Sequence, residues 1–412
     1  MKLSEELKWR GYVHQTTYSD LKILDKTPVS FYLGADPSSD SLTIGNLAAL
    51  KMTDCLIRHG HKGHLLVGGA TGMIGDPDGK KQERDLLSVE QITENKHKLE
   101  TQLKNLFPKN KVEFVDNYDW FKDVGYLDFL RDIGKHVPMS QMLGRDFVAT
   151  RLKDENAGLS YAEFSYALIQ AFDFLHLYKV KNVTLQVCGS DQWGNSIAGV
   201  DLIRRKTGGE AHVLSMPLII NKQTGIKFGK SEAGAVWLDA NKTTPTQFYQ
   251  FWINVDDASV ESYLKIFTDF DKPKIEEIIK EHNKDQSQRF AQKALAEEIT
   301  KWVHGADNAK IAQEVTSYLT GEKNIGEASS HSYEALTLEI PVVKSNSIIE
   351  ALVKTKLASS NTEARRLLAG NAIAVNGKKV VDDKLNSDAF VNGRILLKKG
   401  KAYKDSAIIE KP

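Results

Sequence analysis

Two stretches of the sequence combine glycines with residues that can hold phosphate groups. The first, GADPSSDSLTIGN, runs from Gly34 to Asn46 between two apolar patterns. A strand that ends at Gly34 and a helix that begins near Gly45 would leave free helical N–H groups facing the loop. Those groups and the Thr43 hydroxyl could receive a triphosphate, and Gly45 would let an adenine ring approach the backbone. An ordinary capped helix after a strand-to-helix turn is the alternative.

The second stretch, IKFGKSEAGAVWLD, covers residues 226–239 and places Lys227 and Lys230 three positions apart among glycines. Two ammonium groups on such a loop could swing onto phosphates and neutralise charge as pyrophosphate leaves. Two solvated surface lysines are the alternative. Neither stretch is a P-loop or a G-x-G-x-x-G loop, and GGATGMIGDPDGKK at 68–81 also fails to match either pattern.

A polar stripe provides a third candidate site. Tyr166, Gln170 and Asp173 are spaced i, i+4 and i+7, so they share one face if residues 163–177 form a helix. A phenol hydroxyl could donate to Asp173 while the other two polar groups meet an ammonium group, which suits a tyrosine ligand. A polar stripe that is satisfied internally is the alternative.

The surrounding pattern predicts how these residues are positioned. Short β-rich runs at 30–35, 64–67, 111–115 and 183–187 alternate with helical patterns such as 89–106 and 163–177. This alternation predicts a parallel sheet, and such sheets bind ligands at the carboxyl ends of their strands. From about residue 244 the pattern becomes helical, which predicts an all-α domain.

Length and composition indicate a soluble chain with more than one domain. The 412 residues exceed one ordinary core, the net charge is +1, and no apolar run approaches the roughly 18 residues of a membrane-spanning helix. The N-terminal sequence MKLSEELKWRG is charged rather than secretory. With only Cys55 and Cys188, a disulfide framework is not expected, and we expect a reducing, cytoplasmic location.

The C-terminal segment is basic, whereas the rest of the chain is not. Residues 345–412 hold 13 lysines and arginines against 7 acidic residues, and the remainder holds 42 against 47. Residues 320–341 are polar, with little helical period, and are interpreted as a linker. An anionic partner is therefore expected for the tail and not for the body.

Within the tail, two predicted elements carry the basic residues. Ser360 or Asn361 can cap a helix that carries Arg365 and Arg366, and Asn376-Gly377 predicts a hairpin turn before Lys378 and Lys379. Such a cluster suits phosphate contacts to structured RNA. A solvated basic face is the alternative.

Several motifs together resemble one family. TIGN at 43–46 and KFGKS at 227–231 resemble the HIGH and KMSKS signatures of class I aminoacyl-tRNA synthetases. YLGADPSSDSL, LVGGATGMIGDPDGKK, YAEFSYALIQAFDFLHLY, CGSDQWGN and FYQFWINVDD resemble the bacterial-type tyrosyl-tRNA synthetases in order along most of the chain. The resemblance implies an enzyme that forms tyrosyl-AMP and pyrophosphate from L-tyrosine and ATP, with Mg²⁺ accompanying ATP. Tyrosine is then transferred to the 3′ end of tRNA(Tyr).

The resemblance also implies an architecture of α/β class. A Rossmann-like parallel-sheet catalytic domain is expected at 1–225, and the lysine loop with an α-helical anticodon-region domain at 226–320. A linker at 321–344 and a small α+β RNA-binding domain at 345–412 follow. The active form is expected to be a homodimer, with no membrane partner and no metal held by the protein.

Each matching position takes an expected role from the resemblance. Tyrosine would be bound at the phenol by Tyr32 and Asp173, at the α-amino group by Asp76, Tyr166 and Gln170, and also by Gln192. ATP would be bound by Gly34, Asp36, Ser38, Gly45, Gly189, Asp191 and Lys230. The catalytic phosphate contacts would be Thr43, Asn46, Lys80, Arg84, Lys227, Lys230 and Ser231. Arg365, Arg366, Lys378 and Lys379 would contact tRNA.

Some positions depart from the family pattern. Thr43 and Asn46 replace both histidines of HIGH, although hydrogen bonding to phosphate can survive, and Cys188 stands where glycine is usual beside the ribose site. The lost histidines motivate a different hypothesis, an RNA-binding paralogue without aminoacylation activity. A tryptophanyl enzyme is a further alternative, but Asp173 facing an indole would be hard to explain.

A group of possible metal ligands is set aside. Cys55, His59, His61 and His64 lie within CLIRHGHKGH, but Gly60 and Gly63 interrupt the helical spacing and His64 begins a predicted strand. A helix C-terminus with favourable imidazoles is therefore preferred to a zinc site.

Overall fold

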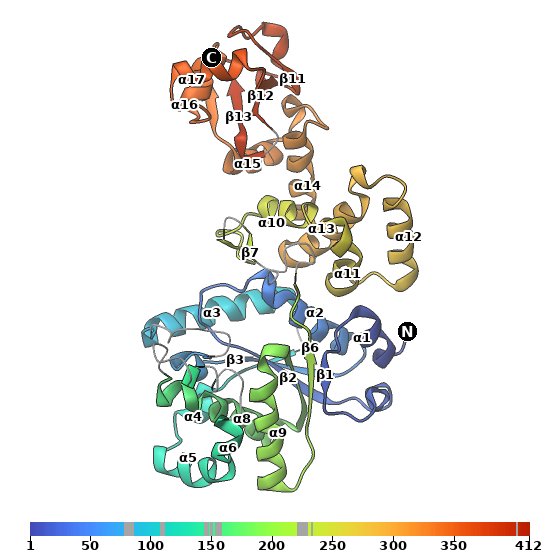
Figure 1. The fold of residues 1–412 in the computed structure, drawn as a ribbon, viewed down its shortest axis with the longest axis vertical. Helices are drawn as coiled ribbons and strands as arrows, with labels where there is room; N and C mark the ends of the chain where they lie inside the picture. The colour runs from blue at the N-terminus through green and yellow to red at the C-terminus, as the bar shows by residue number, and fades with distance from the viewer. Residues whose placement is uncertain are drawn as a thin grey trace. The chain divides into compact units, whose positions relative to one another are not determined.

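The computed structural model divides the chain into two compact units, one of residues 1–242 and 256–291, the other of residues 243–255 and 292–412 (Figure 1). It describes residues 1–77, 86–107, 112–143, 148, 151–152, 159–220, 230–231, 234–400 and 403–412. At 141, 230, 231 and 403 it describes the backbone alone. Across these residues, no helix has both the length and the apolar character needed to cross a membrane.

The first unit is built on a six-stranded sheet in the order β1-β6-β5-β2-β3-β4. Its strands are β1 (Gln15–Thr16), β2 (Ser30–Ala35), β3 (Lys62–Val67), β4 (Val112–Asp116), β5 (Val183–Gly189) and β6 (His212–Met216). All neighbours run parallel except β1, which is antiparallel to β6. The predicted parallel sheet is confirmed. The strand order reverses between β2 and β5, where open parallel sheets bind ligands beyond the carboxyl ends.

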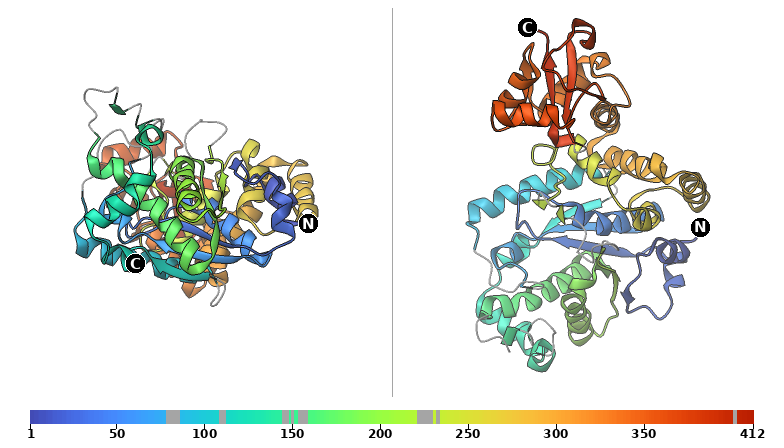
Figure 2. Two further views of the ribbon diagram at one scale, coloured as in Figure 1. Left: turned by 90° about the horizontal axis from the view of Figure 1, so that it is seen from below. Right: turned by 45° about the horizontal axis from the view of Figure 1, so that its top comes forward.

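Helices cover both faces of this sheet. Figures 1 and 2 show α2 (Ile44–Arg58) and α3 (Val89–Leu106) on one face, and α8 (Tyr161–Lys181) and α9 (Trp193–Thr207) on the other. The remaining helices of the unit are α1 (Leu3–Arg10), α4 (Tyr118–Phe121), α5 (Tyr126–Asp132), α6 (Met139–Leu143), α11 (Asp257–Phe267) and α12 (Lys272–His282). The helical patterns predicted at 89–106 and 163–177 are confirmed.

Helix α8 is fixed by its start and by its apolar face. Ser160 and Glu163 form a capping box, in which the Ser160 hydroxyl accepts from the Glu163 N–H at 3.2 Å. Ala171 and Phe174 of α8 are fully buried and pack with Tyr32 of β2 and Leu66 of β3. The sheet and α8 therefore share one core, which sets the position of the polar stripe on α8.

The second unit combines helices with a small sheet. Its helices are α10 (Pro245–Ile253), α13 (Phe290–His304), α14 (Ala306–Thr320), α15 (Ser330–Glu339), α16 (Ile348–Lys354) and α17 (Asn361–Ala369). The sheet order is β11-β10-β12-β13-β9, with β9 (Val342–Lys344), β10 (Ile373–Val375), β11 (Lys378–Lys379), β12 (Arg394–Lys399) and β13 (Ser406–Glu410). The predicted α-helical pattern and the small α+β part are both present.

The local predictions for the tail are confirmed. Ser360 is the N-cap of α17, and its hydroxyl accepts from the Glu363 N–H at 3.2 Å. Asn376 and Gly377 have φ angles of +48° and +80° and join β10 to β11. Both conformations are those of a two-residue hairpin turn, which asparagine and glycine adopt at low cost.

The prediction of a linker at 321–344 is wrong for residues 330–339, which form α15. Leu336 and Ile340 are buried against Leu319 of α14 and against Leu396 and Ile408 of the sheet. A polar segment can form a helix when its few apolar side chains pack against an existing core. The polar composition of residues 330–339 therefore did not indicate the helix. The domain boundaries at 225, 320 and 344 stay predictions.

Leu336→Ala should lower the free energy of unfolding by about 2 to 4 kcal/mol, because the buried side chain leaves a cavity between α14 and the sheet. Leu338 lies on the same helix but is 71% exposed, so Leu338→Ala is the matched control and should cost about 0.5 kcal/mol or less. Urea denaturation measures both. Equal losses would contradict the packing of α15.

Candidate active site

Several predicted substrate-binding residues lie at the carboxyl edge of the first sheet. Gly34 is the last residue but one of β2 and Gly189 is the last of β5, and Asp36 and Asp191 follow these glycines by two residues. The Tyr166 hydroxyl of α8 reaches this edge and donates to Asp36 Oδ2 at 2.6 Å. The structure therefore brings the polar stripe of α8 together with the loop after β2.

Asp173 is the most buried acid of the site, with 2% of its surface exposed. Its carboxylate accepts from Asn117 Nδ2 at 3.1 Å and from Trp120 Nε1 at 3.0 Å. Burial raises the pKa of Asp173 to about 8, and the two hydrogen bonds oppose that rise. Asn117 and Trp120 were not predicted from the sequence, although their place shortly after β4, at the ligand edge of the sheet, was a usable signal.

The Tyr32 hydroxyl lies in the same buried region. Tyr32 is 1% exposed, and its ring packs against Phe174 at 5.3 Å between centroids. Burial, together with the Asp173 charge, raises the pKa of Tyr32 well above its usual value. Within the described part of the chain its hydroxyl has no hydrogen-bond partner. A buried hydroxyl without a partner beside a buried carboxylate is the arrangement expected where a ligand supplies the missing group.

The Gln186 side-chain oxygen is a second buried polar atom without a partner among the described residues, next to Tyr32. Gln186 of β5 is the register partner of Tyr32 of β2, so both side chains stand on one face of the sheet. Gln186 is 3% exposed, and its Oε1 has no partner among the described residues. Gln186 was not predicted from the sequence, because it lies inside an apolar strand with no motif around it.

The second end of the candidate site carries acidic and amide groups. Gln192 Nε2 donates to Asp76 Oδ2, and Asn195 Nδ2 donates to Gln192 Oε1 at 3.1 Å. The second bond fixes which end of the Gln192 amide faces Asp76. Gln170 is half-buried on α8, one turn before Asp173. A carboxylate beside a phenol oxygen and amide groups is suited to a ligand ammonium.

Glycines 68 and 69 allow the loop after β3 to approach these acids. A Cβ on Gly68 would lie 2.5 Å from Asp36 Oδ1 and would also overlap Thr71 Oγ1, and a Cβ on Gly69 would overlap Asp116 Oδ1. No larger side chain fits there without moving those groups. The GGAT sequence is therefore explained by close approach of backbone and carboxylates.

The loop after β2 ends in a capped helix. Thr43 is the N-cap of α2, and Asn46 Oδ1 accepts from the Thr43 N–H at 3.0 Å and from its hydroxyl at 3.2 Å. The capping alternative is therefore realised, while Gly45 and Asn46 remain exposed at the helix start. Asp36 and Ser38 also line a small hollow of about 80 Å³. The phosphate role of Thr43 and Asn46 stays a prediction.

The two predicted phosphate-binding stretches are connected through their backbones. Val236 O accepts from the Ile44 N–H at 3.0 Å, and Thr43 pairs with Trp237 in an isolated bridge. The segment that follows the lysine loop is thus attached to the start of α2. Lys80, Arg84 and Lys227 lie outside the described residues, and Lys230 and Ser231 are described only as backbone of a short hairpin with residues 234–235.

Both cysteines are buried free thiols. Cys55 lies near Glu6 and His59, but the Glu6 carboxylate already accepts from Arg10 and interacts with His59, each at 2.7 Å. Burial raises the pKa of both Cys55 and Cys188 to about 12, so both thiols stay protonated. Cys188 receives a weak hydrogen bond from Ser196 at 3.5 Å.

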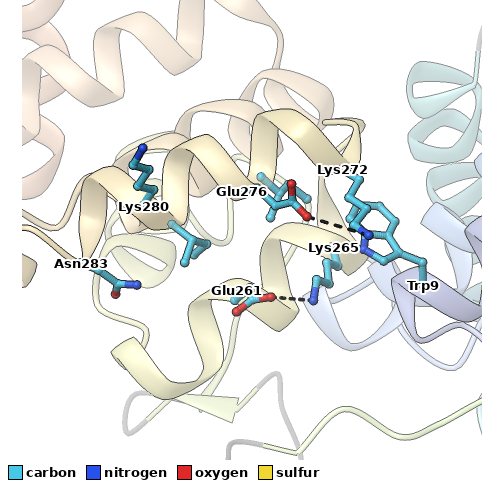
Figure 3. Close-up of a pocket in the computed structure, with 9 residues that line it drawn as sticks. Trp9, Glu261, Lys265, Lys272, Glu276, Lys280 and Asn283 are labelled. Carbon is cyan, nitrogen blue, oxygen red and sulfur yellow. Dashed lines mark hydrogen bonds and ion pairs between the residues drawn. The ribbon is translucent and has the colours of Figure 1, made fainter.

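A separate cavity of about 610 Å³ lies between α1, α11 and α12 (Figure 3). Trp9, Lys265 and Lys272 line it, and Lys265 is paired with Glu261 at 2.6 Å. None of the predicted site residues lines this cavity. It is therefore not part of the site at the sheet edge.

Asp173→Asn should change how stability depends on pH. An aspartate with a pKa near 8 in the folded state and 3.8 when unfolded keeps its proton longer in the folded protein, so stability falls as pH rises from about 4 to 8. An asparagine at this position cannot ionise, so the variant does not lose stability in this way. The unfolding free energy of the variant minus that of the parent should therefore increase by up to about 4 kcal/mol from pH 5 to pH 8. Urea denaturation without ligand measures this. The exposed Asp119→Asn is the control, and a pH-independent difference for Asp173→Asn would contradict the raised pKa.

Comparison with known proteins identifies the family. Residues 24–320 match the family described as tRNA synthetases class I (W and Y), and residues 334–404 match the Tyrosine--tRNA ligase SYY-like C-terminal domain. The chain is 42% identical over 415 residues to Tyrosine--tRNA ligase 2 of Bacillus cereus (strain ZK / E33L), covering 97% of this chain and 98% of the relative. It is 40% identical over 398 residues to Tyrosine--tRNA ligase of Bacteroides fragilis (strain YCH46), covering 92% of each.

Solved structures agree with this assignment. The C-terminally truncated mitochondrial tyrosyl-tRNA synthetase of Aspergillus nidulans superposes with a TM-score of 0.70 at 29% identity, covering 77% of this chain and 94% of that one. The tryptophanyl-tRNA synthetase of Plasmodium falciparum, at 15% identity and a TM-score of 0.54, shares the fold. The chain therefore belongs to the tyrosine-specific branch of the class I tRNA synthetases, the tyrosine--tRNA ligase family.

Proposed function

We propose that the chain is a tyrosine--tRNA ligase, which forms tyrosyl-AMP and pyrophosphate from L-tyrosine and ATP and transfers tyrosine to the 3′ end of tRNA(Tyr). The observation that carries the proposal is the pairing of a buried carboxylate, Asp173, with a buried hydroxyl, Tyr32, that has no partner among the described residues. This pair matches the one polar group that distinguishes tyrosine from phenylalanine.

At the phenol end, each protein group has one task. The phenol hydroxyl of the substrate would donate to Asp173, while the Tyr32 hydroxyl would donate to the phenol oxygen. Phenylalanine would fill the same space and leave both buried groups without a partner, which costs more than the loss of one contact. Rejection of phenylalanine by tyrosine-specific synthetases is itself a standard example of this effect.

At the other end, Asp76, Tyr166 and Gln170 would hold the α-ammonium group. Tyr166 gives its hydroxyl proton to Asp36 at 2.6 Å, so its oxygen is left as an acceptor for an ammonium N–H. Gln192, held by Asn195, would lie beside the carboxylate of the substrate. The amino acid would then span the pocket from Asp173 to Asp76.

The ATP site would lie at the ends of β2 and β5. Gly34 is exposed, and a Cβ added to it would have only Leu66 Cδ2 within 4 Å, at 3.8 Å. The space beside this backbone is therefore open to a ligand. Gly189 and Asp191 would hold the ribose, and Asp36, Ser38 and Gly45 would border the nucleotide. Thr43, Asn46, Lys80, Arg84, Lys227, Lys230 and Ser231 would contact the phosphates.

No side chain has to act as nucleophile or base in the first step. The tyrosine carboxylate attacks the α-phosphorus of ATP, the bond to the bridging oxygen breaks, and pyrophosphate leaves. The protein would contribute orientation of the two substrates and stabilisation of charge on the leaving phosphates. Mg²⁺ bound to ATP would share in that stabilisation.

The tRNA would be held by basic residues of the second unit. Arg365 and Arg366 are exposed on α17, and Lys378 and Lys379 are exposed on β11. Exposed cations on a capped helix and a hairpin suit contacts to the phosphates of structured RNA. The match of residues 334–404 to a tyrosine--tRNA ligase C-terminal domain supports this role.

Exposed apolar side chains support a homodimer. Tyr126 and Leu127 of α5, Met139 of α6 and Tyr161 of α8 are between 57% and 77% exposed. The Tyr161 hydroxyl lies close enough to raise the pKa of Tyr126, so these two residues are neighbours although they belong to separate helices. Large contiguous apolar patches on a protein surface mark interfaces.

Leu127→Asp should convert the dimer to a monomer, because a charge on a 77% exposed leucine would be buried at the interface. Sedimentation equilibrium measures the mass. Ile23→Asp changes an exposed residue of similar size outside this patch and is the control. A dimer that persists in the Leu127 variant would refute this interface.

Amino-acid-dependent exchange of pyrophosphate into ATP tests the proposed activity. Exchange should occur with tyrosine and fall by orders of magnitude with phenylalanine and tryptophan, because only tyrosine pairs with Asp173 and Tyr32. Exchange with tryptophan instead would support the tryptophanyl alternative, and no exchange with intact tRNA binding would mean an RNA-binding paralogue.

The double variant Arg365→Glu with Arg366→Glu should spare pyrophosphate exchange and impair charging of tRNA. Loss of both exchange and charging would contradict a role of these arginines confined to tRNA.

A further inference from the structure

A chain of hydrogen bonds joins the two ends of the amino-acid pocket. It runs from Asp173 through Asn117 and Thr71 to Asp36, and from there to Tyr166. Asn117 is 0% exposed and Thr71 is 2% exposed, so water does not compete for the two bonds that Asn117 donates, whereas Asp36 is half-buried. Three of the five residues were predicted to bind substrate, and the two that connect them were not.

The direction of every bond in this chain is determined by its neighbours. The Ala70 N–H donates to Asn117 Oδ1 at 2.7 Å, which fixes the orientation of the Asn117 amide. Its two Nδ2 protons therefore go to Thr71 Oγ1 at 3.0 Å and to Asp173 Oδ2 at 3.1 Å. Because Thr71 accepts from Asn117, its single proton is free to be donated to Asp36 Oδ1 at 2.7 Å.

These directions prepare both ends for the same ligand. Asp173 receives donors on both oxygens, which stabilises the ionised form that can accept a phenol proton. Asp36 receives one donor from Thr71 and one from Tyr166, and a Tyr166 hydroxyl that donates its proton to Asp36 keeps its oxygen as an acceptor. A phenol proton and an ammonium proton would each find an acceptor, at opposite ends of one connected network.

The backbone is shaped to hold Thr71 in place. Gly68 lies so close that a Cβ there would overlap Thr71 Oγ1 and lie 2.5 Å from Asp36 Oδ1. Gly72 N–H bonds to Gly68 O at 2.7 Å and closes the turn around Thr71. The tight turn therefore leaves room for the Thr71–Asp36 hydrogen bond and for little else.

We propose that Thr71, acting through Asn117 and Asp36, is a positioning residue that couples recognition of the phenol to recognition of the α-ammonium group. The proposal rests on the proposed function, since it takes tyrosine as the ligand. Thr71 touches neither reacting atom; it fixes the orientation of the groups that touch the substrate. Loss of its hydroxyl removes the acceptor of one Asn117 Nδ2 proton and the donor to Asp36 Oδ1, so both ends of the pocket are affected at once.

Trp120 provides an internal comparison. Its Nε1 donates to Asp173 Oδ1 at 3.0 Å, and its ring stacks on His176 at 4.4 Å. It therefore supports the phenol end without belonging to the path through Thr71 to Asp36. A change at Trp120 should weaken recognition of the phenol alone.

Two binding ratios in four proteins test the coupling. The ratio of dissociation constants for L-phenylalanine and L-tyrosine measures recognition of the phenol, and the ratio for 3-(4-hydroxyphenyl)propionate and L-tyrosine measures recognition of the ammonium group. Thr71→Val keeps the shape of the side chain and removes its hydroxyl, so both ratios should fall about tenfold, the effect of roughly one hydrogen bond.

Two variants are the controls. Thr71→Ser keeps the hydroxyl, so both ratios should stay within about threefold of the parent values, and Trp120→Phe should lower only the phenylalanine-to-tyrosine ratio.

Other outcomes would overturn the proposal. If Thr71→Val is folded and leaves either ratio within about twofold of the parent, or if Trp120→Phe lowers both ratios equally, Thr71 does not couple the two ends. If Thr71→Val does not fold, Thr71→Cys takes its place, since a thiol fits and donates only weakly. A parent protein that does not prefer tyrosine to phenylalanine would instead refute the proposed function itself.

Discussion

The site depends on a carboxylate that is removed from water. Asp173 lies at 2% exposure between the sheet and the helices that cover it, and burial alone would favour its neutral form. Hydrogen bonds from Asn117 Nδ2 and Trp120 Nε1 partly offset the cost of burying the charged form. The Tyr32 hydroxyl in the same buried region has no partner among the described residues. An arrangement that lowers stability in the empty protein is expected where a ligand completes it.

The α/β architecture explains how such distant residues meet. Asp36, Gly68 and Asn117 all follow the ends of neighbouring parallel strands, so a short loop is enough to bring each to the same edge. Helix α8 covers one face of the sheet and adds Tyr166 and Asp173. Glycine at 68 then permits the close approach through which Thr71 connects both ends of the pocket.

Much of this arrangement could be predicted from the sequence, and the exceptions have physical reasons. Periodicity identified the strands and helices, and Asn376-Gly377 identified a hairpin, because these signals are local. The residues that hold Asp173 were missed because Asn117 lies 56 positions away, and such a contact exists only after the sheet has formed. The helix at 330–339 was missed because its apolar residues pack on a core formed by other segments.

A crystal structure with a non-hydrolysable tyrosyl-adenylate analogue would locate both ends of the bound substrate. We expect the phenol oxygen to lie within about 3 Å of both the Tyr32 hydroxyl and the Asp173 carboxylate, with the ammonium group near Asp76 and Tyr166. Asn117 and Thr71 should keep their hydrogen bonds in the complex. A ligand bound with its phenol away from Asp173, or with its ammonium group at that carboxylate, would refute this mode of tyrosine recognition.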